Sequence, residues 1–315
     1  MGHFIDGQWQ PGWYGSDSQG NFVRPATTFR QPLQKEALYQ GRYLLYVSLA
    51  CPWAHRTLIA RSILGLNKQL EVAVVDWLLD DNGWAFNPQR PDCTPDPLFQ
   101  SAYLREVYLR AQSNFTGRVT VPVCWDRQEG TIVNNESREI LRGLALLATH
   151  RYDLAPDAGV DAAIDRLYNS INNGVYRCGF ASSQSAYDEA VSELFSALDY
   201  WEQVLGRQPF AAGQHFSEAD ICFFTTLLRF DPVYVVHFKC SLKRILDYPN
   251  LWAYLRSLYQ LPGVAETCNL EHIRHHYFES HRHINPTGIV ARCPAGYLGA
   301  PHTRWQQFPQ AIFPA

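Results

Sequence analysis

The sequence predicts an α/β domain followed by an all-α domain, and three observations support this prediction. Between residues 43 and 75, two short apolar segments flank one segment with helical spacing, which is the pattern of a β-α-β unit. From residue 160 onward, apolar residues recur at helical spacing in one segment after another. The chain has 315 residues, enough for two domains that each bury a core.

The composition excludes several classes of protein. Hydrophobic residues make up 46% and charged residues 18%, as in globular proteins and unlike disordered ones. The net charge of -3 gives no electrostatic reason to bind nucleic acid or an anionic membrane. No apolar run approaches the ~18 residues of a membrane-spanning helix, and Met1–Asp6 lacks the features of a signal peptide. We therefore expect a cytoplasmic protein without nucleic-acid or membrane partners.

The first half of the chain contains the elements of a thioredoxin-like domain, which we assign to residues 41–150. The expected order is strand 43–48, helix 52–66, strand 70–75, helix 101–112, strands 119–124 and 131–133, and helix 135–147. The third strand contains Pro122, which argues for a bulge, an edge position or a cis bond. In thioredoxin-like folds, a proline at this position has a cis peptide bond and lies beside the reactive cysteine.

The second half is expected to form a helical domain over residues 158–315. Ser217-Glu-Ala-Asp220 is a capping box before an apolar run. Residues 1–40 are expected to be an irregular extension, residues 150–158 a linker, and the tail from Glu279 irregular. The helices are expected at residues 160–176, 185–205, 217–230 and 251–260.

Cys51 is the candidate catalytic residue. It lies directly before Pro52 at the start of the first helix, where unpaired backbone N–H groups and the helix dipole favour the thiolate. The pKa of Cys51 is expected to fall below the ~8.5 of a free thiol, with His55 and Arg56 adding positive charge nearby. Ala54 stands where a dithiol motif has its second cysteine. A mixed disulfide formed at Cys51 must therefore be reduced by an external thiol, which we expect to be glutathione. The alternative is an inert core cysteine.

The remaining cysteines and histidines do not predict a metal site. The cysteines are scattered without a CxxC pair, which argues against a disulfide framework or a zinc cluster. The histidines of the segment His272–His283 have a spacing that a metal site can use, but no cysteine or carboxylate arrangement accompanies them. We expect no metal, and a solvated or tyrosine-supporting role for these histidines.

Several short segments in consistent order carry a family resemblance. The first reads Ser48-Leu-Ala-Cys-Pro-Trp-Ala-His-Arg-Thr57, and the others lie at residues 83–86, 119–126, 132–137, 172–176, 225–240, 276–277, 280–281 and 284–286. Together they resemble the glutathionyl-hydroquinone reductases, the Xi class of glutathione transferases. One departure is Ile289-Val-Ala-Arg-Cys-Pro294, where relatives usually read Ile-Val-Pro and then Gly-Pro. It lies past the catalytic segments and bears on the path of the tail.

The resemblance implies a reaction, a helical glutathione-transferase C-terminal domain and a glutathione site. The Cys51 thiolate would attack the glutathionyl sulfur of a glutathionyl-hydroquinone, releasing hydroquinone, and a second glutathione would release oxidised glutathione from the mixed disulfide. The residues that match the family's glutathione site are Trp84, Arg118, Val119, Thr120, Val121, Glu136 and Ser137. Glu136 and Ser137 would hold the γ-glutamyl ammonium and carboxylate, and Arg118 the glycyl carboxylate. Without the resemblance, Glu136 is interpreted as an acidic residue that interacts favourably with the helix dipole, and Arg118 as a solvent-exposed charge.

Tyr176, Tyr234 and Tyr277 match the tyrosines of the family's hydroquinone pocket. Their hydroxyls would donate to the ring hydroxyls, with Tyr176 and Tyr277 as donors to the reacting substrate. A single tyrosine on a helix is more often a core residue than a ligand. The resemblance also implies a homodimer, and it assigns no role to residues 1–40 or to the histidine segment.

Two other functions are compatible with a single reactive cysteine. An omega-like thioltransferase or dehydroascorbate reductase would share Cys51, whereas Trp84 and the three tyrosines favour the hydroquinone reductase. A non-catalytic assembly module with the same fold usually lacks the nucleophile, and the presence of Cys51 argues against it.

Overall fold

The computed structural model describes residues 1–13, 15–148, 154, 157–293 and 296–313. The chain forms two compact units. The first unit comprises residues 1–14, 24–150 and 267–289, and the second comprises residues 15–23, 151–266 and 290–315. This division differs from the expected one, because residues 267–289 belong with the first unit and residues 15–23 with the second. The expected linker at residues 150–158 lies largely outside the described residues.

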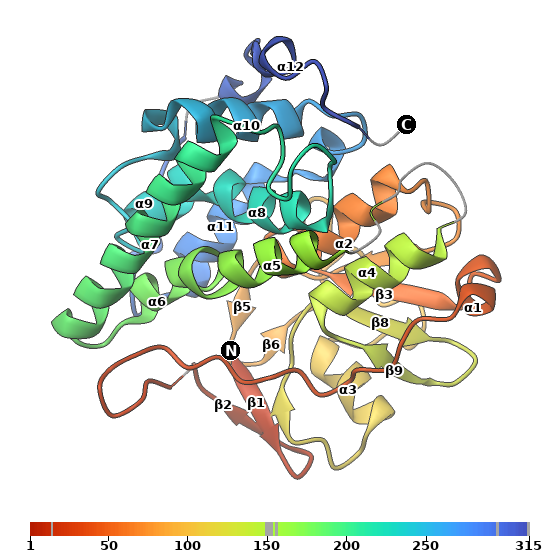
Figure 1. The fold of residues 1–315 in the computed structure, drawn as a ribbon. Helices are drawn as coiled ribbons and strands as arrows, with labels where there is room; N and C mark the ends of the chain where they lie inside the picture. The colour runs from red at the N-terminus through yellow and green to blue at the C-terminus, as the bar shows by residue number, and fades with distance from the viewer. Residues whose placement is uncertain (14, 149–153, 155–156, 294–295, 314–315) are drawn as a thin grey trace. The chain divides into compact units, whose positions relative to one another are not determined.

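A four-stranded sheet forms the centre of the first unit (Figure 1). Its strands, in spatial order, are β4 (Glu71–Val74), β3 (Tyr43–Val47), β8 (Val123–Asp126) and β9 (Thr131–Asn134). The β3 strand runs parallel to β4 and antiparallel to β8, and every residue of β3 and β8 is buried. Helices α2 (Pro52–Ile63) and α4 (Ser137–Leu147) pack against each other on one face, and α3 (Leu104–Ala111) covers the other. The predicted thioredoxin-like domain is therefore confirmed.

The strand expected at residues 119–124 begins later than predicted. Residues 119–122 are not part of the sheet, and β8 begins at Val123, directly after a cis peptide bond between Val121 and Pro122. A proline has no N–H to donate to a strand ladder, so pairing starts only after it. The register pairs Tyr46 of β3 with Val123 of β8.

The prediction that residues 1–40 are irregular was wrong for two parts of this segment. Strands β1 (Gly2–Ile5) and β2 (Gln8–Pro11) form a hairpin, and α1 (Lys35–Tyr39) is a short helix. Asp6 and Gly7 form the two-residue turn, both with positive φ, and Asp-Gly is a strong hairpin signal in sequence. The hairpin also pairs with β7 (Gly117–Arg118), which makes a three-stranded sheet in the order β2-β1-β7.

The first unit also contains a helix and a small hairpin that were not predicted. Strands β5 (Leu79–Asp80) and β6 (Gly83–Trp84) pair with each other within the long insert. The α11 helix (Leu270–Ser280) contacts β5, although it lies almost 200 residues further along the chain than this strand. Its sequence is rich in histidine and charged residues, so the apolar periodicity that marks a helix is weak there.

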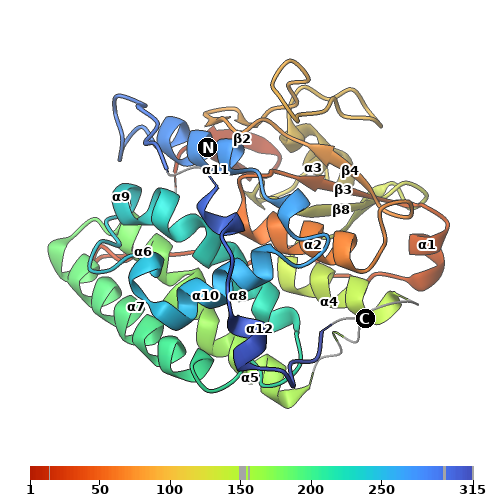
Figure 2. The same cartoon turned by 90° about the horizontal axis from the view of Figure 1, so that it is seen from above.

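The second unit is helical (Figure 2). The long helix expected at residues 160–176 is divided by a π-helical segment at Tyr168–Asn172, and a second π-helical segment, Phe230–Tyr234, follows α8. The helices are α5 (Ala158–Leu167), α6 (Gly174–Phe180), α7 (Gln184–Leu205), α8 (Glu218–Arg229), α9 (Val235–His237), α10 (Pro249–Tyr259) and the short α12 (Arg304–Gln307). No helix among the described residues is both long and apolar enough to cross a membrane. Short 3-10 segments lie at Ile245–Asp247, Ala265–Thr267 and Tyr297–Gly299.

The tail of the second unit is anchored by one buried arginine. Arg304 in α12 donates to the backbone carbonyls of Leu205, Gln208 and Pro209, at 2.8–3.0 Å. The tail from residue 279 is therefore less irregular than predicted. Of the departing segment Ile289–Pro294, the last residue lies outside the described part of the chain.

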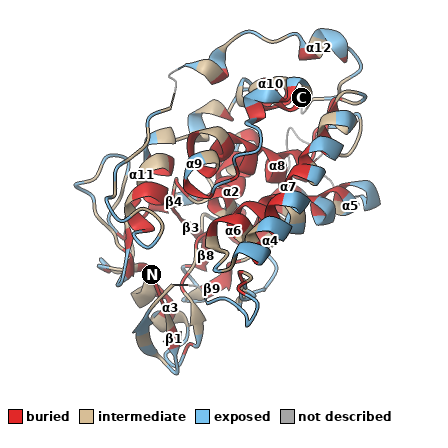
Figure 3. Ribbon diagram, turned by 90° about the vertical axis from the view of Figure 1, so that its left-hand side faces the viewer, coloured by how far each residue is buried: buried red, intermediate tan, exposed pale blue. Residues whose placement is uncertain are grey.

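The α8 helix is the core of the second unit, since all of its residues are buried (Figure 3). The predicted capping box at its start is confirmed. The Asp220 carboxylate accepts from the Ser217 N–H at 2.8 Å, the Ala211 N–H at 2.8 Å and the Tyr254 hydroxyl at 2.6 Å. One buried carboxylate thus connects the start of α8 with the preceding loop and with α10.

Replacing Asp220 with Ala is expected to lower the stability of the second unit by about 2–5 kcal/mol, because four buried donors, the Ser217 hydroxyl among them, lose their acceptor. Urea unfolding followed by circular dichroism measures the loss. The control is Asp188→Ala at an exposed position of α7, expected to change stability by less than about 0.5 kcal/mol. Equal shifts in the two variants would contradict the role assigned to Asp220.

Candidate active site

Cys51 is the N-cap residue of α2, as the sequence predicted. Its backbone is extended, with φ −74° and ψ 123°, and Pro52 occupies the first turn of the helix. The Cys51 thiol is half-buried and lies 3.6 Å from the carbonyl oxygen of Val121, the residue before the cis-proline. The sulfur therefore faces both the positive end of a helix and the backbone segment expected to pair with glutathione.

Glu136 and Ser137 lie together at the start of α4. Glu136 is the N-cap residue, and one of its carboxylate oxygens accepts from the Arg138 N–H at 3.2 Å and from the Ser137 hydroxyl at 3.4 Å. Ser137 is buried, and its hydroxyl accepts from the Arg56 guanidinium at 3.5 Å. Arg56 belongs to α2, so this contact connects the helix that carries Cys51 with the helix start that carries Glu136 and Ser137. The contact thus brings a guanidinium, a hydroxyl and a carboxylate together at the two helix starts.

Residues 119–121 are fixed by a tyrosine that the sequence did not single out. The Tyr108 hydroxyl, from α3, donates to the Thr120 carbonyl at 2.9 Å and accepts from the Thr120 N–H at 3.2 Å. It also accepts from the Asn135 side-chain amide at 3.1 Å. Both backbone groups of Thr120 thus face Tyr108, while Val119 and Val121 are buried. Tyr108 holds the segment before β8 and the turn before α4 in one network.

Trp84 lies on β6, and α11 contacts the β5–β6 hairpin through β5. The Trp84 ring stacks on His276, with ring centroids 5.1 Å apart. His276 Nδ1 lies 2.7 Å from the Trp77 carbonyl oxygen, and the Ser280 hydroxyl accepts from the Leu79 N–H at 3.0 Å.

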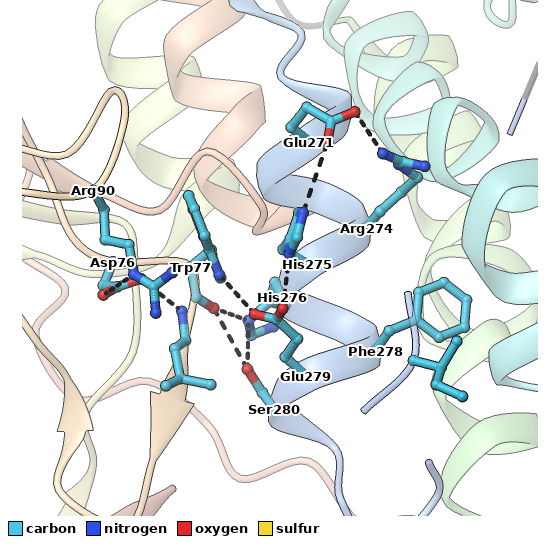
Figure 4. Close-up of polar contacts among 12 residues, drawn as sticks. Asp76, Trp77, Arg90, Glu271, Arg274, His275, His276, Phe278, Glu279 and Ser280 are labelled. Carbon is cyan, nitrogen blue, oxygen red and sulfur yellow. Dashed lines mark hydrogen bonds and ion pairs between the residues drawn. The ribbon is translucent and has the colours of Figure 1, made fainter. Parts of the chain in front are cut away.

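The Trp77 side chain adds a further contact between this loop and α11. Its indole N–H donates to Glu279 at 2.9 Å, and the second Glu279 oxygen lies 2.8 Å from His275 Nδ1 (Figure 4). Arg90 lies over the Trp77 ring, 4.5 Å from its centroid. The histidines of α11 therefore support aromatic residues. Among the described residues, no group of three or more histidine, cysteine or acidic side chains is arranged to hold a metal ion.

Arg118 makes contacts that the sequence did not predict. Its two terminal nitrogens donate to the backbone carbonyls of Gly12 and Trp13, each at 2.8 Å. It is not the solvated charge that its sequence context suggests in isolation. A side chain proposed to bind the glycyl carboxylate of glutathione thus also holds the N-terminal segment of the chain.

The three predicted tyrosines do not all lie in one unit. Tyr176 on α6 and Tyr234 in the second π-helical segment are neighbours in the second unit, with ring centroids 6.2 Å apart. Phe238 contacts both rings, at 5.4 Å each. Tyr277 lies on α11 in the first unit, where its ring packs against His276 and His281. Tyr234 is the last residue of a π-helical segment, a rare element that is frequent at functional sites.

Comparison with known proteins identifies the family. Residues 50–146 match the glutathione S-transferase N-terminal domain, and residues 184–257 match the C-terminal domain. The chain is 47% identical, over 327 residues, to the glutathionyl-hydroquinone reductase YqjG of Escherichia coli strain K12, covering 98% of this chain and 100% of that one. It is 44% identical to the glutathionyl-hydroquinone reductase PcpF of Sphingobium chlorophenolicum over 304 residues, covering 94% and 97%.

The chain belongs to the glutathionyl-hydroquinone reductases, the Xi class of glutathione transferases. A solved Xi-class glutathione transferase from Natrialba magadii superposes with a TM-score of 0.90 at 48% identity, covering 97% of both chains. The glutathione-bound structure of YqjG superposes with a TM-score of 0.85 at 45% identity, covering 97% of this chain and 100% of that one. This chain is therefore an enzyme of the glutathione transferase type.

Three other cysteines of this Xi-class enzyme differ from Cys51 in their surroundings. Cys93 is also half-buried, but burial, reinforced by the Asp76 carboxylate, raises the pKa of its thiol to about 12. Cys124 and Cys240 are fully enclosed, and burial raises the pKa of both thiols as well. Only a thiolate attacks an electrophile readily, so these groups are poorly suited to nucleophilic chemistry near neutral pH.

Iodoacetamide at pH 8 is therefore expected to modify Cys51 at least about tenfold faster than Cys93, because Cys93 remains protonated at this pH. Peptide mapping by mass spectrometry, after quenching at a series of times, measures both rates in one sample. Unfolding the protein in urea before labelling should bring the two rates together. Equal rates in the folded protein would show that Cys51 has no advantage from its position.

Proposed function

We propose that this enzyme reduces glutathionyl-hydroquinones to hydroquinones at the expense of glutathione. The observation that carries the proposal is the position of Cys51, at the N-terminus of α2 and 3.6 Å from the Val121 carbonyl oxygen. The names of the relatives YqjG and PcpF support the substrate class. The glutathione-bound structure of YqjG supports glutathione as the co-substrate.

The proposed first half-reaction transfers the glutathionyl group to Cys51. The Cys51 thiolate attacks the glutathionyl sulfur and forms an S–S bond, while the bond between that sulfur and the ring carbon breaks. The electron pair of the broken bond stays on the ring, whose carbon takes up a proton, and hydroquinone leaves. In the second half-reaction a glutathione thiolate attacks the glutathionyl sulfur of the mixed disulfide, and oxidised glutathione leaves with Cys51 again a thiolate. The substrate is reduced by two electrons, and two glutathionyl groups are joined.

The proposed glutathione site occupies the helix starts of the first unit. Glu136 pairs with the γ-glutamyl ammonium, and Ser137 with the N–H groups at the start of α4 binds the adjacent carboxylate. The backbone of Val121 pairs with the peptide of glutathione, whose sulfur then lies at Cys51. Trp84 packs against the tripeptide. Arg118 attracts the glycyl carboxylate with a guanidinium that the Gly12 and Trp13 carbonyls already orient.

The proposed hydroquinone site uses tyrosine hydroxyls. Tyr176, Tyr234 and Tyr277 donate to the ring hydroxyls of the substrate, and Tyr176 and Tyr277 stabilise the charge that develops on the ring as the sulfur leaves. A thioltransferase of the omega type needs no such donors, because a small disulfide has no ring hydroxyls.

Cys51→Ala is expected to lower the turnover of a glutathionyl-hydroquinone by at least about a thousandfold, since it removes the thiol that is proposed to form the mixed disulfide. The steady-state release of hydroquinone, followed by liquid chromatography, measures the loss. The matched control is Cys93→Ala, which should retain most of the activity. Near-normal turnover by Cys51→Ala would rule out the mechanism.

Phe substitution at Tyr176, Tyr234 or Tyr277 keeps the ring and removes only the donor. One lost hydrogen bond is expected to reduce kcat/KM for the glutathionyl-hydroquinone by about two- to tenfold, and more where the partner carries developing charge. The reduction of a small glutathionylated thiol, measured on the same variants, should change much less. An equal loss with both substrates would indicate a structural role, and no loss with either would remove these tyrosines from the hydroquinone site.

A further inference from the structure

The N-terminal segment of residues 24–31, here called the strap, runs beside the turn between β9 and α4. Its backbone pairs with the end of β9 and with that turn, since Gln31 donates to the Val133 carbonyl at 3.0 Å and Asn135 donates to the Phe29 carbonyl at 3.0 Å. The Phe29 N–H donates in turn to the Asn135 side chain at 3.1 Å. Arg30 forms a bidentate ion pair with Glu139 in the first turn of α4. The strap is thus held by backbone hydrogen bonds and by charge, over a sequence separation of more than 100 residues.

The strap also contacts the side chains around the proposed glutathione site. The Thr27 hydroxyl donates to one carboxylate oxygen of Glu136 at 3.1 Å. The other oxygen accepts from the Arg138 N–H and the Ser137 hydroxyl. Both oxygens of the Glu136 carboxylate are therefore oriented, one by its own helix and one by the strap.

A second contact lies next to the nucleophile. Arg24 packs its guanidinium on the ring of Trp53, 4.9 Å from the centroid, and Arg56 lies 4.3 Å from the same centroid. Trp53 is two residues after Cys51 in the first turn of α2. The strap thus reaches both helix starts that form the proposed site.

The N-terminal hairpin contacts the remaining segments of that site. The Trp9 indole N–H donates to the Asp81 carbonyl at 2.8 Å, and the terminal amine donates to the Asp80 carbonyl, within the hairpin that carries Trp84. The carbonyls of Gly12 and Trp13 accept from Arg118. Each segment that carries a charged or aromatic residue of the proposed glutathione site is therefore bonded to the first 31 residues of the chain.

We propose that Arg24 and Thr27 of the strap line the glutathione site and that Thr27 is a positioning residue for Glu136. This inference rests on the proposed function and adds a part of the chain that lies outside the thioredoxin-like sheet. A carboxylate oxygen has two lone pairs, so the oxygen that accepts from Thr27 can also accept from the γ-glutamyl ammonium. The hydroxyl of Thr27 holds the carboxylate in the orientation that the ammonium requires, and an unheld carboxylate would lose rotamer freedom on binding.

The test measures the binding of S-methylglutathione by isothermal titration calorimetry, a probe that needs no reducible substrate. Thr27→Val keeps the shape of the side chain and removes the donor, and the Kd is expected to rise about two- to tenfold. Thr27→Ser keeps the hydroxyl and should bind with a Kd close to that of the wild type. Thr28→Val, at the exposed neighbouring position, is the matched control and should leave the Kd unchanged.

A double-mutant cycle with Glu136→Ala distinguishes positioning from a general effect on the strap. If Thr27 acts through Glu136, Thr27→Val should have no further effect on the Kd in the Glu136→Ala background. An equal loss in both backgrounds, or no loss in either, would overturn the inference, and neither result depends on the turnover of hydroquinones. Absence of any S-methylglutathione binding by the wild-type enzyme would overturn the proposed glutathione site itself, whereas failure of the wild type to reduce glutathionyl-hydroquinones would overturn only the proposed reaction.

Discussion

The antiparallel pairing of β3 with β8 determines where the nucleophile lies. Tyr46 near the end of β3 is opposite Val123 at the start of β8. The segment that leaves β3 toward Cys51 and the segment that enters β8 through Val121 therefore lie side by side at the same end of these two strands. The sulfur of Cys51 thus meets a backbone carbonyl at 3.6 Å because two buried strands place it there, and the first turn of α2 adds the helix dipole.

The proposed glutathione site also requires that the starts of α2 and α4 lie close together. Arg56 of α2 donates to Ser137 of α4, and the two helices pack against each other along one face of the sheet. Tyr108 adds a connection from the opposite face, since its hydroxyl bonds both to Thr120 and to Asn135. A glutathione bound at Glu136 and Ser137 and paired with Val121 would then reach Cys51 with its sulfur, without a rearrangement of the sheet.

The parts of this arrangement that depend on local signals could be predicted from the sequence. Cys51 directly before Pro52 predicted an N-cap cysteine, the spacing of apolar residues predicted the helices of the second unit, and Ser217 with Asp220 predicted a capping box. These features depend on interactions between residues that lie only a few positions apart in the sequence. The Asp6-Gly7 turn is an equally local signal, since Asp-Gly between two strand segments is typical of a hairpin.

The parts that depend on distant contacts could not be predicted from the sequence. Nothing near Arg118 indicates that it binds the carbonyls of Gly12 and Trp13, more than 100 residues earlier. The stacking of His276 on Trp84 likewise joins two segments that the sequence separates by almost 200 residues. For the histidines of α11 the sequence left a solvated and a tyrosine-supporting role open, and the structure shows that their rings contact Trp77, Trp84 and Tyr277.

In the proposed reaction, Cys51 carries the glutathionyl group between the two half-reactions. The most direct test mixes the enzyme with one equivalent of a glutathionyl-hydroquinone in the absence of free glutathione, and follows the protein by intact and peptide mass spectrometry. We expect the mass of one glutathionyl group on the peptide that contains Cys51, together with one equivalent of free hydroquinone. Hydroquinone that appears only after glutathione is added, from a protein that never gains the glutathionyl mass, would contradict it.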